Sequence, residues 1–184
     1  MLLLCSLGLL LFSQLRADAA RKENAAVVAE INTIFSTRYP GVMDTYLNMD
    51  MPVMELNGQD YIGVVEIPAF GLSVPIGSSW DAGKVTSFPC RFWGTVYDGS
   101  LVIGGSDQPG QFDCLDRIQD GSIVTVGDMT GMEFTYVVDC VERSKTADRA
   151  VLMKEDADLT LFVRDAYNFN YILVRCIAKG STGF

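Results

Sequence analysis

The sequence predicts a mainly β domain of about eight strands, closed into a barrel or packed as a sandwich. Short runs rich in β-branched and aromatic residues follow one another from residue 58 onward, and glycine-containing turn pairs separate several of them. Apolar residues make up 49% and charged residues 20% of a chain of 184 residues, which suits one folded domain with a short additional segment. We therefore expect a single core.

The chain begins with an uncharged, leucine-rich stretch, MLLLCSLGLLLFSQL, that ends at Leu15. As a helix this stretch rises about 22 Å, which is less than the thickness of the hydrocarbon core of a bilayer, and no basic residue precedes it. We assign residues 1–16 to a membrane anchor truncated at its start, or to the apolar part of a signal peptide. A buried core helix is the third interpretation.

A helix is predicted next, from Asp18 to about Arg38. Apolar residues recur there at helical spacing, and the Asp18 side chain could cap the first turn. Residues 39–41, Tyr-Pro-Gly, end the pattern. We assign residues 17–54 to a helical stalk and linker, and residues 55–184 to the β domain. The apolar positions of the helix are Ala25, Val28, Ile31, Ile34 and Phe35.

Eight strands are predicted in the β domain. Each is a short apolar, β-branched or aromatic run, and the glycines of the turn pairs 98–99, 120–121 and 130–131 supply the positive φ that tight turns need. Short helical pieces are expected near residues 80–86 and 111–118. The predicted strands span residues 61–68, 72–76, 91–97, 100–105, 122–128, 132–142, 159–163 and 171–178.

Composition and charge exclude several kinds of function. The formal charge of −9 disfavours a nucleic-acid partner, because such partners are bound through Lys and Arg. Histidine is absent, so no imidazole can act as a general base, a metal ligand or a pH switch. We expect no metal or other cofactor. The cysteines are widely spaced without a C-x-x-C pair, and we interpret most of them as buried apolar residues. They are Cys5, Cys90, Cys114, Cys140 and Cys176.

The order of the sequence blocks resembles that of the sortases, which are membrane-anchored cysteine transpeptidases that attach surface proteins to Gram-positive cell walls or join pilins. The resemblance covers roughly residues 55–178, and the spacing is similar to that of the class B-like branch common in clostridia. It implies a closed sortase-type β-barrel with short helices and an N-terminal helix. The matching blocks are YIGVVEIPAFGLSVPI (61–76), FPCRFWGT (88–95), LVIGGS (101–106), the stretch 112–138, DLTLFV (158–163) and ILVRC (172–176).

Sortase chemistry, as the resemblance implies it, needs a cysteine, a histidine and an arginine. The thiolate attacks a threonyl carbonyl, the histidine donates a proton to the leaving amine, and the arginine binds the developing oxyanion. In this chain Ser106 occupies the histidine position of a V-I-A-G-H-N pattern, and Arg164 occupies the cysteine position of a T-L-x-T-C pattern. Arg175, in V-R-C, is interpreted as the retained arginine.

The resemblance therefore implies an extracytoplasmic, membrane-anchored protein of a Gram-positive bacterium that has lost transpeptidase activity. Its expected partner is a sorting-signal peptide, a pilin or another sortase. Arg164 and Arg175 are expected to place two guanidinium groups at the floor of the former active site, unless Arg164 pairs with a nearby acid such as Asp165. The alternative is a divergent active sortase with a displaced nucleophile, and a decayed gene without a present role is a third reading.

Overall fold

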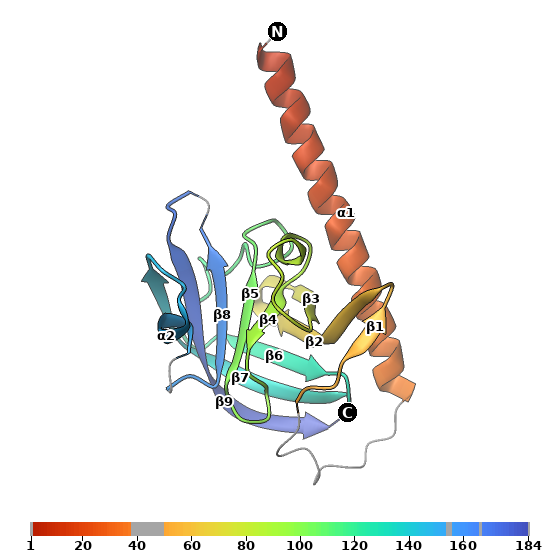
Figure 1. Ribbon diagram of the computed structural model, residues 1–184, viewed down its shortest axis with the longest axis vertical. Coiled ribbons are helices and arrows are strands. Elements are labelled where there is room, and N and C mark those ends of the chain that lie inside the picture. The colour runs from red at the N-terminus through yellow and green to blue at the C-terminus, as the bar shows by residue number, and fades with distance from the viewer. Residues whose placement is uncertain (1, 38–49, 154–155, 166, 184) are drawn as a thin grey trace.

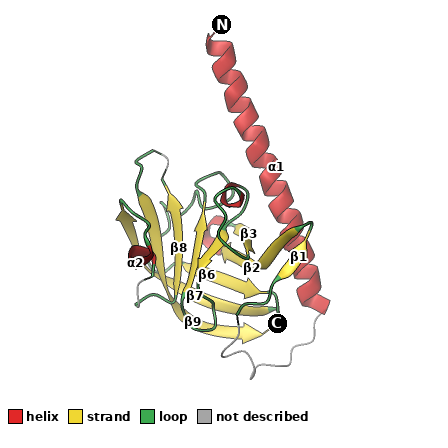
Figure 2. Ribbon diagram, viewed as in Figure 1, coloured by secondary structure: helices red, strands yellow, loops and turns green. Residues whose placement is uncertain are grey.

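The computed structural model describes residues 2–37, 50–153, 156–165 and 167–183 of the chain. Strands dominate the described part, and the longest helix, α1 (Leu2–Thr37), runs beside them (Figures 1 and 2). The end of the predicted helix at residue 38 and most of the predicted linker lie outside the described residues. The described residues form nine strands: β1 (Met54–Leu56), β2 (Gln59–Ile67), β3 (Leu72–Gly77), β4 (Cys90–Trp93), β5 (Leu101–Gly105), β6 (Ile123–Asp128), β7 (Met132–Ser144), β8 (Leu159–Arg164) and β9 (Tyr171–Gly183).

Eight of these strands form a closed barrel, which confirms the predicted fold class. Their order is β2–β3–β4–β5–β8–β9–β7–β6, and β6 closes the ring by pairing with β2. The pairings β3–β4 and β5–β8 are parallel, and the other pairings of the ring are antiparallel. β1 was not predicted; it adds to β2 through a tight turn at Asn57 and Gly58, both of which have positive φ.

The barrel interior is filled by alternate residues of its strands, as expected for a small closed barrel. On β8 the side chains of Leu159, Leu161 and Val163 lie in the main core cluster, and Cys176 of β9 joins them. The intervening residues of β8 point outward, where Phe162 belongs to a separate outer cluster. This alternation places every second residue of β5, β8 and β9 on the outer face, where the candidate site lies.

The C-terminal half of α1 packs on the barrel, whereas its N-terminal half projects past it (Figure 1). Val27, Val28 and Ile31 are buried against residues of β2 and its neighbours, and Asn24 Nδ2 donates to the Ser87 carbonyl oxygen at 3.0 Å. The helix begins at Leu2 instead of Asp18, so it continues across the boundary placed between residues 16 and 17. Over the described residues, no helix has the length and apolar character required to span a bilayer.

The short helical pieces differ from the expectation. Residues 80–86 contain only the 3₁₀ turn η2 (Lys84–Thr86), and residues 111–117 form turns instead of a helix. Two pieces were not predicted: η1 (Pro68–Phe70) and α2 (Arg149–Leu152). Asp148 caps α2, because its Oδ1 accepts a hydrogen bond from the Val151 amide at 2.9 Å.

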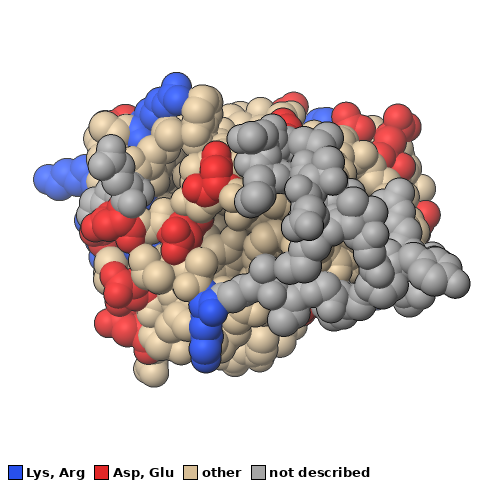
Figure 3. All heavy atoms as spheres, turned by 90° about the horizontal axis from the view of Figure 1, so that it is seen from below, with Lys and Arg blue, Asp and Glu red and all other residues tan. Residues whose placement is uncertain are grey.

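The surface charge agrees with the acidic composition. In the view from below, acidic side chains appear at several places on the face, whereas basic side chains are confined to a few (Figure 3). This distribution fits a partner that is uncharged or basic better than one that is acidic.

Candidate functional site

Ser106 and Arg164 lie at the same edge of the barrel. β5 and β8 are parallel neighbours in which Gly105 pairs with Val163. Ser106 follows β5 directly and Arg164 is the last residue of β8, so the two strands end side by side at these positions. The structure thus brings together Ser106 and Arg164, the two residues that the sequence resemblance predicts at the histidine and cysteine positions.

Arg164 is an exposed residue at this edge. Its Cζ lies 5.9 Å from the ring centroid of Phe169, within the range of a cation–π contact. The Asp165 carboxylate accepts hydrogen bonds from the Tyr167 amide at 2.9 Å and from Asn168 Nδ2 at 2.7 Å. The hydrogen bond from the Asn168 side chain is the main cause of a lowered pKa of Asp165. Asp165 therefore organises the β8–β9 loop.

Arg175 does not lie beside Arg164, so the expectation of two guanidinium groups at one floor is wrong. The antiparallel register of β8 and β9 pairs Arg164 with Tyr171 and pairs Arg175 with Thr160. The two arginines therefore lie near opposite ends of β8. Sequence reasoning missed Tyr171 as the neighbour of Arg164, because a hairpin register depends on the conformation of its loop.

Arg175 is 2% exposed and is surrounded by acceptors. Its Nη1 donates to the Leu152 carbonyl oxygen at 2.8 Å and to Thr160 Oγ1 at 3.0 Å. Its Nε and Nη2 both lie 3.2 Å from Glu142 Oε2. These contacts attach α2 to the outer face of the barrel and leave the guanidinium without access to a substrate, so the geometry assigns Arg175 a structural role.

Three thiols lie in apolar surroundings. Burial raises the pKa of Cys90 and of Cys114 to about 11, and it raises the pKa of Cys176 to about 12. A thiol with so high a pKa is protonated at neutral pH and is a poor nucleophile. Cys176 faces the core, away from the outer face, as expected from its place next to Arg175. The side chain of Cys5 is outside the described part of the structure.

Ser106 offers no replacement for a thiolate. Its Oγ is buried and has no hydrogen-bond partner among the described residues, and the chain has no histidine to act as a base. The backbone of Ser106 is held by the following loop. Its amide donates to Gln111 Oε1 at 3.3 Å, and its carbonyl oxygen accepts from the Phe112 amide at 3.0 Å.

Three aromatic rings cover the outer face of β5 and β8. Trp80 stacks on Phe162 with a centroid distance of 5.5 Å, and Phe92 meets both rings edge to face at 5.5 and 5.7 Å. A β-carbon on Gly104 would lie inside van der Waals contact with Trp80 and Phe162. The sortase pattern has alanine at this position, so the chain departs from the pattern there as well. A side chain at position 105 is excluded as well, because a β-carbon on Gly105 would lie 2.6 Å from the Phe112 ring.

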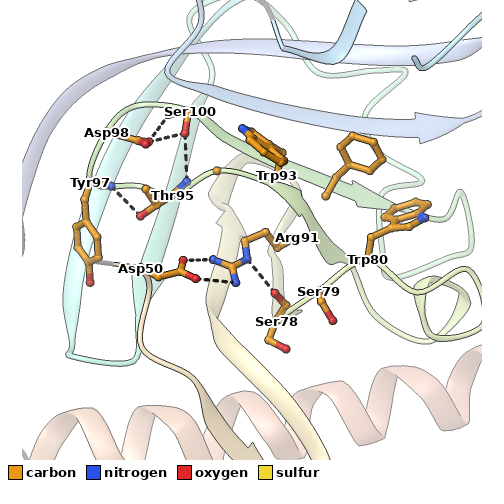
Figure 4. A pocket seen from close by; sticks show the side chains of 12 residues that line it. Asp50, Ser78, Ser79, Trp80, Arg91, Trp93, Thr95, Tyr97, Asp98 and Ser100 are labelled. Carbon is orange, nitrogen blue, oxygen red and sulfur yellow. Dashed lines mark hydrogen bonds and ion pairs between the residues drawn. The ribbon is translucent and has the colours of Figure 1, made fainter. Parts of the chain in front are cut away.

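A hollow of about 610 Å³ lies next to this aromatic cluster, beside β4 (Figure 4). Arg91 crosses it: its guanidinium pairs with the Asp50 carboxylate, and its Nε donates to the Ser78 carbonyl oxygen at 2.8 Å. The hydrogen bond from Arg91 holds the pKa of Asp50 below its ordinary value. The lining residues are Asp50, Ser78, Ser79, Trp80, Arg91, Phe92, Trp93, Gly94, Thr95, Tyr97, Asp98 and Ser100.

The described residues contain no group of three His, Cys, Asp or Glu side chains arranged to hold a metal ion. The polar side chains that line the hollow carry hydroxyl groups, indole N–H groups, the guanidinium group of Arg91 and the two carboxylates of Asp50 and Asp98. They are suited to hydrogen bonding and charge pairing with a ligand.

Comparison with known proteins identifies the fold of the chain. No model of a protein family matches the sequence, and no curated protein matches it. Sortase C of Clostridium perfringens, solved with the C-terminal cell wall sorting motif, has a TM-score of 0.58 and 18% identity, with 90% of each chain covered. Sortase C of Streptococcus pneumoniae has a TM-score of 0.58 and 19% identity, with 88% of this chain and 89% of that chain covered.

Sortase A of Listeria monocytogenes also has a TM-score of 0.58, at 10% identity, with 67% of this chain and 90% of that chain covered. The matching structures thus include sortases of classes C and A, and a class E sortase of Streptomyces avermitilis is similar as well. Identities this low establish the fold and not the activity. The chain has the sortase fold, while its assignment to the class B-like branch stays a prediction.

Proposed function

We propose that this sortase-fold protein binds an extended peptide without cleaving it. The single observation that carries the proposal is the pair of residues at the edge where β5 and β8 end together, Ser106 and Arg164. Transpeptidation through a thioester requires a thiolate at such an edge and an acid to protonate the leaving amine. A serine without a base and an exposed guanidinium supply neither group.

The buried cysteines also support binding without cleavage. Cys90, Cys114 and Cys176 are buried, and burial shifts their pKa values away from those of reactive thiolates. A displaced-nucleophile mechanism would need one of the cysteines to be both ionised and accessible. These three are neither, so among the described cysteines a displaced-nucleophile mechanism would have to depend on Cys140, which is only partly buried.

The ligand we propose is a sorting-signal segment of a surface protein or pilin, or an extended segment of a partner sortase. Support comes from the fold and from a neighbour of the same fold that was solved with a cell wall sorting motif. We propose further that the protein is anchored by its N-terminal segment on the outer face of a Gram-positive membrane. The apolar residues 2–15 of α1 and the projection of that half of the helix beyond the barrel are consistent with such an anchor (Figure 1).

The test uses the full chain and a fluorescein-labelled library of peptides with LPxTG-like motifs. Fluorescence anisotropy reports binding, and mass spectrometry of the same samples reports cleavage. The proposal predicts saturable binding of at least one peptide with no cleaved product. Cleavage would show that the thiols or Ser106 are reactive after all, and the absence of binding across the library would refute the proposed ligand.

A further inference from the structure

We infer that the hollow beside β4 is the peptide-binding site, and that the peptide adds to the free edge of β4 as an additional strand. This inference rests on the proposed function, since it locates the ligand which that function requires. It places the ligand on a flank of the barrel, on the far side of the aromatic cluster from the edge occupied by Ser106 and Arg164.

The backbone provides the first argument. On one side β4 pairs with β5, at Cys90 with Gly104, Arg91 with Ile103 and Trp93 with Val102. On its other side β3 pairs with β4 at a single position, Gly77 with Cys90.

Beyond that pair, the stretch from Arg91 to Trp93 has no second strand partner among the described strands, and it lines the hollow. A free strand edge presents amide and carbonyl groups that an extended peptide can pair with. This requirement for main-chain pairing selects a peptide over other ligands of similar size.

The aromatic residues provide the second argument. Trp80 and Trp93 line the hollow and are 40% and 42% exposed, although large aromatic side chains are usually well covered. Both rings are held in place: Trp80 stacks on Phe162, and the Arg149 guanidinium lies 3.8 Å from the Trp93 ring centroid. Rigid aromatic anchors lose little conformational entropy when they bind a ligand, which favours affinity.

The charges in the hollow define the kind of peptide. Arg91 is the one basic residue of the lining, and its charge is paired with Asp50. The second carboxylate, that of Asp98, accepts a hydrogen bond from the Ser100 amide at 3.0 Å. An acidic peptide would meet this carboxylate and the net charge of −9 of the chain. The site therefore fits an uncharged or basic extended segment with apolar side chains.

Figure 4 shows how these groups are arranged. Trp93 and Trp80 lie along the strand on one side of the hollow, while Asp50, Arg91 and Ser78 lie on the other. An extended segment running along β4 would place alternate side chains toward the indoles and toward the Asp50–Arg91 pair. Main-chain hydrogen bonds to β4 then provide affinity. The indole rings and the Asp50–Arg91 pair provide selectivity for the peptide's side chains.

The experiment measures binding of the tightest labelled peptide of the LPxTG-like library to the full chain and to two variants. Trp93→Ala is expected to weaken binding at least tenfold. Its matched control is Tyr167→Ala, which removes an aromatic side chain that is 91% exposed in the β8–β9 loop, near Arg164, and is expected to leave binding unchanged. Unfolding temperatures of both variants verify that the fold is intact.

A second measurement leaves the protein unaltered. Alternate amides of an extended peptide point to the same edge, so N-methylation at alternate amides blocks pairing with β4 in only one of the two possible registers. We expect that register to lose at least tenfold in affinity. Hydrogen exchange of the amides from Arg91 to Trp93 should slow in the complex. Binding that resists both methylation registers and Trp93→Ala would overturn the location and preserve the proposed function. Its loss in Tyr167→Ala would place the site at the β8–β9 loop instead. Failure of every peptide to bind would overturn both.

Discussion

Trp80 and Phe162 stack with their ring centroids 5.5 Å apart and an interplanar angle of 27°, and together they cover Gly104 on the outer face of β5. Trp80 comes from the segment after β3, whereas Phe162 comes from β8. The stack therefore joins two parts of the barrel wall that are distant in sequence. It also occupies space over β5, the strand that leads to Ser106.

Gly104→Ala is predicted to destabilise the protein by about 1–3 kcal/mol, the usual cost of overpacking. The new β-carbon would meet the rings of Trp80 and Phe162, which are packed against Phe92 and cannot move freely. Thermal unfolding, monitored by circular dichroism, measures the loss of stability. The matched control is Gly127→Ala, where the β-carbon would make an ordinary contact with Phe35 at 3.6 Å, and no loss is expected. Equal unfolding temperatures for the two variants would contradict this account.

Arg175→Met is predicted to cost about 3 kcal/mol or more, because it removes the buried guanidinium that donates to Glu142 and to two carbonyl groups of α2. Arg164→Met, at an exposed position, should change the free energy of unfolding by no more than about 0.5 kcal/mol. Urea titration of both variants measures the difference. If Arg175→Met were as stable as the wild type, the structural role assigned to Arg175 would be wrong.

The buried thiols are predicted to react slowly with iodoacetamide in the native state. Burial raises the pKa of Cys90, Cys114 and Cys176, so the thiolate fraction at pH 8 is on the order of 10⁻³ or less for a pKa of about 11 or above. Raising the pH toward 11 should speed the reaction, because deprotonation favours the reactive form. Peptide mapping assigns the labelled sites. A sample unfolded in urea provides the labelling rate of exposed thiols for comparison. Rapid native labelling of any of the three at pH 7 would identify an unexpected nucleophile.

Restoration of the sortase groups is predicted to require three substitutions: Ser106→His, Arg164→Cys and Tyr171→Arg. The third follows from the register, which places Tyr171 and not Arg175 opposite residue 164. Iodoacetamide at pH 7 should label residue 164 in the triple variant, and more slowly when Tyr171 is retained, because a neighbouring histidine and arginine favour the thiolate. A folded triple variant that is not labelled at residue 164 would show that the site cannot be rebuilt on this scaffold.

Most of the fold could be predicted from the sequence because each strand has its own local pattern. All eight predicted strands are present, since β-branched runs and positive-φ glycines act within a few residues. β4 ends at Trp93 instead of residue 97, because Gly94 turns the chain with a φ of 74°. Phe112, Leu115 and Ile118 have helix-like spacing but do not form a helix, since their burial inside the barrel determines the conformation there.

The candidate site was only partly predictable. Ser106 and Arg164 were singled out because the resemblance to the sortases predicts them at the histidine and cysteine positions, and the parallel pairing of β5 with β8 brings them together. Arg175 was misplaced because its position depends on how residues 165–170 close the hairpin, which local patterns do not determine. The hollow beside β4 depends on where β3 and β4 separate. The consecutive aromatic residues Phe92 and Trp93 were its one visible sign in the sequence.

The most direct test of the central claim is the intact mass of the full chain after incubation with a sorting peptide that carries a thiol-reactive group at the scissile position. An unreactive labelled copy of the same peptide is added as a binding reporter. We predict that the reporter binds and is displaced by excess peptide, while the protein mass remains unchanged. A mass increase of one peptide, located on one of the five cysteines, would contradict the claim and identify the chain as an active enzyme with a displaced nucleophile.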